Sequence, residues 1–329
     1  MRAIEVSAHG GPEVLELVDL PVPEPRSDEV LIAVHTAGVN FIDTYLREGR
    51  YPSTPRYIPG GEGAGVVVAV GDDVVARSVG DRVAWCDGGQ SYAEFTTHRA
   101  ERTLPIPEGV DDAVAGSSLL RGLTAHYLLD GSAHPTAGDT ILVHAGAGGV
   151  GLILTEWATA RGIRVITTVS SDEKESLSRA AGAAEVLRYG DDVAERVRTL
   201  TEGRGVPVVY DGVGATTFEQ SVAATAIRGT IVLFGGASGA VPPFDLQRLN
   251  PAGSLSVTRP TLAHFISDPA EFQWRADEFF TAVADGTLTV NVGQLFALEA
   301  AADAHRALES RRTVGSTALN VTAGAGSGD

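Results

Sequence analysis

From residue 140 onward, short apolar runs alternate with segments of helical periodicity. The apolar runs, of which Ile141-Leu-Val143 is typical, predict buried strands at 140–145, 163–169, 185–188, 207–211 and 230–234. The periodic segments between them predict helices at 150–161, 172–181, 191–201 and 216–227. This alternation is typical of a doubly wound parallel sheet with right-handed crossovers, so the predicted fold class is α/β.

The first 120 residues show a different pattern, in which short strand-like runs are separated by turns rich in Gly, Pro and Asp. The runs lie at 2–6, 14–19, 29–35, 66–70, 80–85 and 91–97, with helical segments at 41–47 and 117–129. Short strands at such close spacing predict an all-β, barrel-like first domain.

The residues after 253 do not continue the alternation. They predict a strand at 254–258, a helix near 269–285, strand-like pieces at 289–297, a helix at 299–310 and a strand at 316–321. The simplest assignment returns most of them to the first domain. The predicted domains are 1–121 with 260–321, then 122–259, and the low-complexity end 322–329 is expected to be a disordered tail.

A glycine-rich segment, Gly146-Ala-Gly-Gly-Val-Gly151, lies between a predicted strand and a predicted helix. Glycines at its first, third and sixth positions match the dinucleotide-binding fingerprint, in which backbone N–H groups approach a pyrophosphate at the helix N-terminus. A glycine-rich surface turn would give the same letters, but the position between a strand and a helix favours nucleotide binding.

Charge and cysteine content exclude several classes of partner. The net charge of -17 and the sequence pI of about 4.8 argue against nucleic acid or an anionic membrane as the main partner. The single cysteine, Cys86, excludes an internal disulfide and a multi-cysteine zinc site. The N-terminus lacks a signal-type apolar region and no apolar run approaches membrane-spanning length, so a cytoplasmic location is expected.

The choice of cofactor is predicted from the end of the second strand of the alternating part. NAD sites usually place a carboxylate there, whereas this chain has Ser170. A small polar residue leaves room for a 2′-phosphate, and Lys174, the only lysine in the chain, is a candidate cation for it. Asp172 is a contrary signal because its charge would repel a phosphate, unless it serves as a helix cap. We therefore predict NADPH.

Several further segments, taken together, resemble a known family. They include Gly38-Val-Asn-Phe-Ile-Asp-Thr-Tyr45, Gly80-Asp-Arg-Val83, Gly148-Gly-Val-Gly151, Val209-Tyr-Asp-Gly-Val-Gly214 and Leu308-Glu-Ser-Arg311. The chain resembles the zinc-independent, zeta-crystallin-like quinone oxidoreductases of the medium-chain dehydrogenase/reductase superfamily over essentially residues 1–321. The resemblance implies a GroES-like, β-barrel-type catalytic domain, a Rossmann domain, NADPH in the cleft between them, and a homodimer.

The resemblance also implies the cofactor contacts. The pyrophosphate would lie on Ala147, Gly148, Gly149 and Val150, and the 2′-phosphate side would include Ser170, Ser171, Lys174, Tyr189 and Arg311. The nicotinamide side would include Thr124, Gly235, Gly236, Ser238, Gly239, Arg259, Thr261 and Leu262, with further contacts from Phe41, Asp43, Tyr45 and Gly212. Relatives often have Asn in place of Gly236, so a side-chain hydrogen bond at that position would be lost.

Catalysis needs few protein groups, because hydride transfer is the chemistry of the nicotinamide. Hydrogen-bond donors near the acceptor's carbonyl oxygen would assist it, and the resemblance places Asn40 and Tyr45 there. A helix cap for Asn40 and aromatic packing for Tyr45 are the structural alternatives, and Asp43 is a weaker third candidate.

No metal is predicted. Zinc alcohol dehydrogenases have a Gly-His-Glu motif, whereas this chain has Gly60-Gly-Glu62, and no cysteine precedes Cys86. The predicted activity is NADPH-dependent quinone reduction, with a quinone or conjugated carbonyl as substrate. A 2-alkenal or enone reductase of the same fold and a non-catalytic NADPH-binding protein with a structural or sensory role remain as alternatives.

Overall fold

The computed structural model describes residues 1–310 and 313–321, which form two compact units. The first contains Met1–Leu120, Phe272–Ala284 and the described residues from Val290 to Val321, and the second contains Arg121–Glu271 with Asp285–Thr289. Arg311 and the tail predicted at 322–329 lie outside the described residues.

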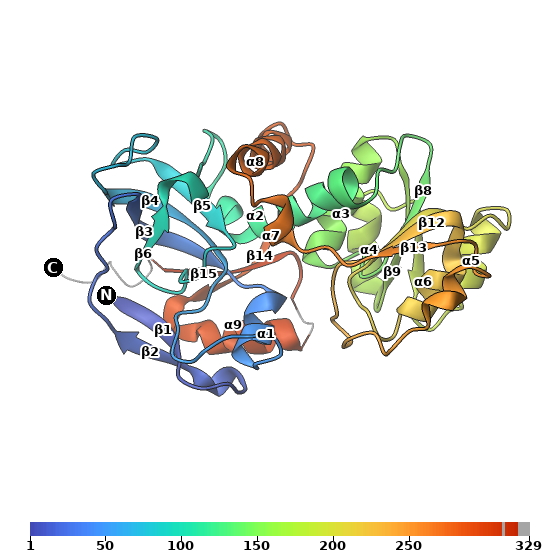
Figure 1. Ribbon diagram of the computed structural model, residues 1–329, viewed down its shortest axis with the longest axis horizontal. Coiled ribbons are helices and arrows are strands. Elements are labelled where there is room, and N and C mark those ends of the chain that lie inside the picture. The colour runs from blue at the N-terminus through green and yellow to red at the C-terminus, as the bar shows by residue number, and fades with distance from the viewer. Residues whose placement is uncertain (311–312, 322–329) are drawn as a thin grey trace. The chain divides into compact units, whose positions relative to one another are not determined.

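A mixed sheet of seven strands forms the centre of the first unit (Figure 1). Its strands are β3 (Glu29–Gly38), β4 (Glu62–Val70), β5 (Arg82–Cys86), β6 (Phe95–Arg99), β7 (Leu104–Pro105), β14 (Val292–Ala297) and β15 (Ser316–Asn320). Their order is β14-β15-β3-β4-β5-β7, and β6 also pairs with β3. The first half of β3 therefore pairs with β6, while its last residues pair with β15. Only β14 and β15 run parallel.

A two-stranded ribbon and several helices complete the first unit. The ribbon consists of β1 (Arg2–Val6) and β2 (Leu15–Asp19), and the helices are α1 (Phe41–Arg47), α9 (Ala301–Glu309) and most of α8 (Pro269–Ala284). One core gathers buried side chains from β1, β3, β5, α9 and β15, among them Ile4, Ile32, Trp85, Ala304 and Leu319. Segments from both ends of the chain thus share one interior.

The second unit is built on a six-stranded, fully parallel sheet in the order β10-β9-β8-β11-β12-β13 (Figure 1). Its strands are β8 (Thr140–Val143), β9 (Arg164–Val169), β10 (Glu185–Arg188), β11 (Val206–Asp211), β12 (Thr225–Leu233) and β13 (Ser256–Thr258). The intervening helices are α3 (Gly149–Ala160), α4 (Asp172–Ala180), α5 (Val193–Leu200) and α6 (Phe218–Ala224). The predicted α/β fold class is confirmed.

Two predictions about individual elements in this unit were wrong. The helix predicted at 216–227 ends at Ala224, and Thr225 already pairs with Val206 in the sheet. The strand predicted at 254–258 does extend the parallel sheet, because β13 pairs with β12 from Ser256 to Thr258. The pattern concealed this extension because only the short 3₁₀ turn Leu246–Leu249 lies between those two strands.

Helix α2 (Asp112–Tyr127) contains the division between the units at residue 120. The remaining elements are short: the α-helix α7 (Leu262–Phe265), a π-helical turn at Leu128–Ser132, and 3₁₀ turns at Pro12–Val14, Ala100–Arg102 and Leu298–Ala300. Within the described residues, no helix has the length and apolar character needed to cross a membrane.

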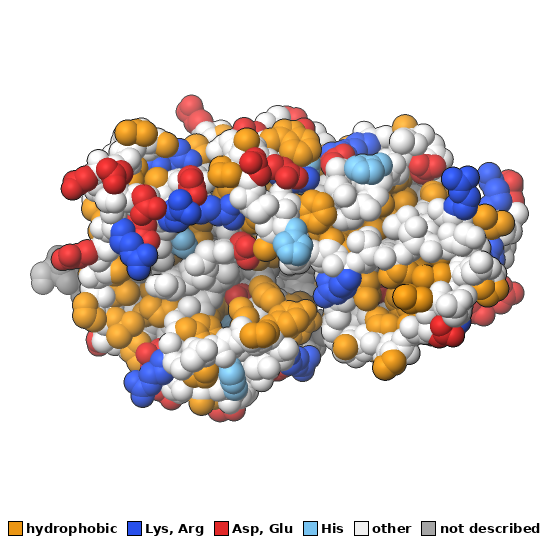
Figure 2. Space-filling view, viewed as in Figure 1, with side chains coloured by type: hydrophobic (Ala, Val, Ile, Leu, Met, Phe, Trp, Pro, Cys, Tyr) orange, Lys and Arg blue, Asp and Glu red, His pale blue; other side chains and the backbone are white. Residues whose placement is uncertain are grey.

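Charged side chains of both signs are spread over the face shown in Figure 2. Acidic and basic groups often form ion pairs, as Arg248 does with Glu219 at 2.5 Å and Arg188 with Asp172 at 2.6 Å. Such exposed pairs contribute little to stability individually.

Candidate functional site

The cofactor residues predicted in the second unit follow the carboxyl ends of its strands. Because all six strands are parallel, these ends lie at one edge of the sheet. In the order of the strands from β10 to β13, the residues that follow are Tyr189, Ser170, the glycine-rich turn, Gly212, Gly235 and Arg259. From β8 the chain adds β9 and β10 on one side of the sheet, and it then returns to add β11, β12 and β13 on the other side. Open α/β sheets bind ligands at such a switch point, which here lies between β8 and β11.

The glycine-rich turn lies at the middle of this edge, between β8 and α3. At two of its glycines, neighbouring atoms lie so close that a side chain would collide with them. A Cβ on Gly151 would lie 2.3 Å from the carbonyl oxygen of Ala145, and one on Gly149 would lie 2.5 Å from Cδ of Arg121. The cap residue Gly148 has no side-chain oxygen, so the helix N-terminus presents its backbone N–H groups without a side-chain cap.

Arg121 is a basic residue at this turn that the sequence did not suggest. Its side chain, from α2, is 7% exposed, and its Nη1 would lie 2.7 Å from a Cβ on Gly149. A guanidinium and a helix N-terminus both favour a negatively charged group. The turn therefore fits a pyrophosphate in shape and in charge.

The residues predicted for the 2′-phosphate lie at the β9 and β10 end of the same edge. Ser171 is the N-cap of α4, and its Oγ accepts a hydrogen bond from the backbone N–H of Lys174 at 3.3 Å. The Tyr189 hydroxyl accepts one from the N–H of Ala145, in the glycine-rich turn, at 3.0 Å. Ser170 is exposed. These residues form one polar surface beside the turn.

Asp172, the contrary signal for NADPH, is the first residue of α4 and not its cap. Its Oδ1 lies 2.6 Å from Nη2 of Arg188, which also pairs with Glu175. This pairing offsets part of the negative charge near Lys174. The arrangement leaves the region suited to a phosphate despite Asp172.

Loops after β11 and β12 pack backbone to backbone at the other end of the edge. A Cβ on Gly235 would lie 2.4 Å from the carbonyl oxygen of Gly212, and Ser238 donates to the carbonyl oxygen of Val213 from both N and Oγ at 2.8 Å. The N–H of Ala215 donates to the carbonyl oxygen of Gly239 at 3.2 Å. A Cβ on Gly236 would meet nothing closer than 3.4 Å, so the backbone there leaves room for the Cβ of the missing Asn.

Asp211 holds this pair of loops from beneath. Its carboxylate is fully buried and accepts hydrogen bonds from the backbone N–H groups of Val213 and Gly214 and from the hydroxyls of Thr217 and Ser221, at 2.7 to 3.0 Å. The sequence did not identify Asp211 as important. Its position at the end of a strand before a Gly-x-Gly turn was the available signal.

The remaining predicted residues of this unit occupy two segments. Thr124 is buried in α2. Arg259 follows β13 and donates from Nη1 to the carbonyl oxygen of Pro260 at 3.2 Å, while Thr261 caps the short helix α7, which begins at Leu262. Ala147 is buried in the glycine-rich turn, and Val150 lies in the first turn of α3.

In the first unit, Asn40 is the N-cap of α1, as its structural alternative proposed. Its backbone N–H donates to Oδ2 of Asp43 at 2.8 Å, and its amide Nδ2 donates to Oε1 of Glu62 at 2.7 Å. All three side chains are buried. Burial, reinforced by the nearby charge of Glu62, raises the pKa of Asp43 to about 7 despite hydrogen bonds to its carboxylate.

Tyr45 lies on α1 in an aromatic cluster. Its ring lies 5.6 Å from that of Tyr51 and 6.2 Å from that of Phe41, and Arg50 lies over it. Phe41 is 38% exposed. Tyr45 therefore has the packing role that its structural alternative proposed, and its hydroxyl remains a candidate donor.

Side chains at the position of the zinc-binding motif are engaged in other contacts. Glu62 accepts from Asn40 and, through Oε2, from the backbone N–H of Leu120 at 2.7 Å. Cys86 is 1% exposed, and burial raises the pKa of its thiol well above the usual value, which disfavours the thiolate that zinc requires.

Comparison with known proteins identifies the family. Residues 26–130 match the alcohol dehydrogenase GroES-like domain and residues 149–281 match the zinc-binding dehydrogenase domain. A quinone oxidoreductase of Pseudomonas aeruginosa is 46% identical over 97% of this chain and 99% of its own length. The chain belongs to the quinone oxidoreductase family. The resemblance seen in the sequence, to this branch of the medium-chain dehydrogenases/reductases, is confirmed.

Two further relatives bear on cofactor and substrate. The structure of mycobacterial Rv1454c in complex with NADPH has a TM-score of 0.95 and 54% identity, and the match covers 98% of this chain and all of that one. A 2-haloacrylate reductase of a Burkholderia species is 36% identical over 97% of this chain and 98% of its own.

Proposed function

We propose that this chain transfers a hydride from NADPH to a quinone or a similar conjugated carbonyl. The chain is an NADPH-dependent oxidoreductase of the quinone oxidoreductase family, as predicted. The observation that carries the assignment of its residues is the order of groups along the carboxyl edge of the parallel sheet, with Ser170 and Lys174 at one end, the glycine-rich turn in the middle and the two packed loops at the other.

This order fits an extended dinucleotide. The first turn of α3 and Arg121 would bind the pyrophosphate, and Lys174, Ser171 and Tyr189 would bind the 2′-phosphate. Loops 212–214 and 235–239 would hold the nicotinamide end, because their backbones already pack together beneath it. Bound NADPH supplies the hydride, and the chain supplies orientation and charge.

Asn40 and Tyr45 are the proposed donors to the acceptor's oxygen. One amide N–H of Asn40 bonds to Glu62, and its second N–H can be donated to an oxygen on which negative charge develops. Asp43 holds the backbone of Asn40 in place, which makes it a positioning residue in this proposal.

Replacing Lys174 with alanine is expected to raise the KM for NADPH by about ten- to a hundredfold, because hydrogen bonds to charged groups contribute about 1.5 to 3 kcal/mol each. The KM for NADH should change little. Arg179→Ala, which removes a cation from the same helix, is the matched control and should leave both values unchanged. Equal kinetics with NADH and NADPH in the wild type would contradict the proposal.

Treatment with a chelator is expected to leave turnover unchanged, because Glu62 is engaged in hydrogen bonds and Cys86 favours its protonated thiol. The measurement is the NADPH oxidation rate with 1,4-benzoquinone before and after treatment, together with the metal content of the purified protein. Stoichiometric zinc would show that the prediction is wrong.

Reduction of the C=C bond of an enone is the second candidate, and the similarity to a 2-haloacrylate reductase favours it. Comparing kcat/KM for 1,4-benzoquinone and 1-octen-3-one separates the two substrates. A non-catalytic NADPH-binding role predicts tight cofactor binding without turnover of either, and membership in an enzyme family argues against it. A homodimer is proposed from the resemblance, and light scattering tests it. The cytoplasmic location expected from the sequence stays a proposal.

A further inference from the structure

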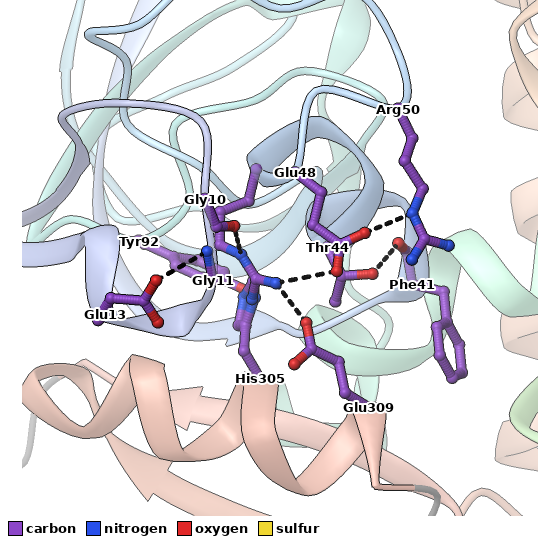
Figure 3. Close-up of polar contacts among 11 residues, drawn as sticks. Gly10, Gly11, Glu13, Phe41, Thr44, Glu48, Arg50, Tyr92, His305 and Glu309 are labelled. Atoms are coloured by element: carbon purple, nitrogen blue, oxygen red, sulfur yellow. Dashed lines mark hydrogen bonds and ion pairs between the residues drawn. The ribbon is translucent and has the colours of Figure 1, made fainter.

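A chain of buried polar side chains connects Asp43 to the C-terminal helix α9 within the first unit. Figure 3 shows His305 and Glu309 projecting from α9 toward the loop of Gly10 and the side chain of Tyr92. His305 Nδ1 lies 3.0 Å from Nη1 of Arg47, and His305 Nε2 lies 3.1 Å from the Tyr92 hydroxyl. That hydroxyl lies 3.5 Å from Oδ2 of Asp43.

Each side chain in this series is almost completely buried. Tyr92 and His305 are fully buried, and Asp43 and Arg47 are 1% exposed. Arg47 is held by further bonds, from Nε to the carbonyl oxygen of Gly10 at 3.0 Å and from Nη2 to Glu48 and Glu309. Water therefore has little access, and the protein itself must determine where each proton lies.

The donors and acceptors can be oriented in one direction only. Arg47 has no acceptor, so Nδ1 of His305 must accept from it. Burial, with the charge of Arg47, lowers the pKa of His305 to about 3, so the ring is neutral and its proton lies on Nε2. Nε2–H then donates to the Tyr92 oxygen, and the Tyr92 O–H donates to Asp43.

The reverse orientation is blocked by Arg47. If a protonated Asp43 donated to Tyr92, the Tyr92 O–H would either lose its acceptor or donate to Nε2 of His305, and in the second case the imidazole proton would move to Nδ1. That proton would point at the guanidinium N–H, so two donors would face each other. The backbone N–H groups of Asn40 and Gly61 also bond to Asp43 and are donors as well. The geometry favours an ionised carboxylate.

We propose that Tyr92, His305 and Arg47 are positioning residues for the reaction. Their one-way series of hydrogen bonds holds Asp43 as a carboxylate that binds the backbone N–H groups of Asn40 and Gly61, and so fixes the start of α1 for turnover. This inference rests on the proposed function for its kinetic readout. Protonation of Asp43 weakens the contact with Asn40, so kcat/KM falls as the pH decreases below about 7.

The other groups that face Asp43 bear on this titration. Glu62 on β4 raises its pKa through charge repulsion, and the donated hydroxyl of Tyr92 lowers it. The pKa of Tyr57, in the loop before β4, is raised chiefly by burial and in part by the charge of Asp43, while the charge of Arg47 lowers it. The pKa of the Tyr92 phenol is raised well above its usual value, chiefly by burial, so it stays protonated and remains a donor.

The test is the pH profile of kcat/KM with NADPH and 1,4-benzoquinone from pH 5.5 to 9. Tyr92→Phe removes the O–H that donates to Asp43. The apparent pKa of the acidic limb, which is the part of the profile where kcat/KM falls at low pH, should therefore rise by about half a pH unit to one pH unit. Relative to each protein's plateau, kcat/KM at pH 6.5 should then fall by a further factor of roughly three to eight. Tyr210→Phe is the matched control, since it removes an equally buried hydroxyl that donates to the carbonyl oxygen of Leu128 in the other unit. Its limb should not move.

A pair of variants at His305 tests the direction of the series. His305→Gln can present an oxygen to Arg47 and an N–H to Tyr92, so it should keep the wild-type limb. His305→Met can do neither and should shift the limb as Tyr92→Phe does. An equal loss of kcat/KM at every pH, with no movement of the limb in either Tyr92→Phe or His305→Met, would overturn the proposal.

A stability measurement tests the same inference without a substrate. The difference in free energy of unfolding between wild type and Asp43→Asn changes with pH, and it becomes constant once the pH rises past the folded-state pKa of Asp43. In a Tyr92→Phe background the same difference should level off at a higher pH. Absence of quinone turnover in the wild type would refute the proposed function alone, whereas an unchanged levelling pH would refute this inference alone.

Discussion

Asp43→Asn is expected to be more stable than the wild type at pH 8 and no more stable near pH 4. Burial raises the pKa of Asp43 from its ordinary value to about 7 in the folded protein. The folded state therefore binds this proton more readily than the unfolded state, and the contribution of Asp43 to stability decreases as the pH rises from about 4 to about 7. A difference of about three pKa units corresponds to about 4 kcal/mol, of which asparagine should recover about half or more.

The measurement is the free energy of unfolding in urea for both proteins between pH 4 and pH 8. Asp28→Asn, at a carboxylate with an exposed side chain, is the control and should show no such dependence on pH. Turnover in Asp43→Asn should be lower than in the wild type, since an uncharged amide cannot accept from every donor. The expected stability advantage of Asp43→Asn over the wild type is larger at pH 8 than at pH 5. If it were instead smaller at pH 8, burial of this charge would have little energetic cost.

Asp211→Ala is expected to lose about 3 to 5 kcal/mol of unfolding free energy, because four buried donors lose their acceptor at once. The loop after β11 and the loop packed on it should also lose order, so NADPH binding should weaken by more than tenfold. Urea unfolding and a fluorescence titration with NADPH measure the two effects.

Two controls separate the role of the Asp211 acceptor from a general effect of removing a carboxylate. Asp211→Asn keeps one oxygen and should give an intermediate loss. Asp245→Ala removes a carboxylate that caps an exposed turn through the N–H of Gln247, and it should cost about 1 kcal/mol or less. If Asp211→Ala were no more destabilising than Asp245→Ala, the buried hydrogen bonds would have little net effect.

The second unit could be predicted from the sequence because its structure is local. Each strand is an apolar run, and each group at the carboxyl edge follows its strand directly, as Ser170 follows β9 and Gly212 follows β11. The helix predicted at 216–227 failed because of its β-branched residues. Thr225 and Ile227 continue the periodicity of α6 but lie in β12, where Thr225 pairs with Val206.

The buried network of the first unit was beyond prediction. Arg47 and His305 are separated by 258 positions, and nothing in either segment indicates that the two side chains meet. The spacing of Asn40 and Asp43 was a visible capping-box pattern, but its burial against Glu62 depends on the register of β4 beside α1. Local spacing thus predicted the cap, and only the tertiary structure gives the proton positions that follow from it.

The pairing of β3 with β15 has a consequence for the order of folding during synthesis. The second unit is almost continuous in the chain, so its residues 121–271 leave the ribosome as one stretch. The first unit lacks α9 and β15 until residues 301–320 emerge, and core residues such as Ile32 and Val34 must wait for Leu319. The second unit is therefore expected to fold first, with the N-terminal strands exposed until β15 has emerged.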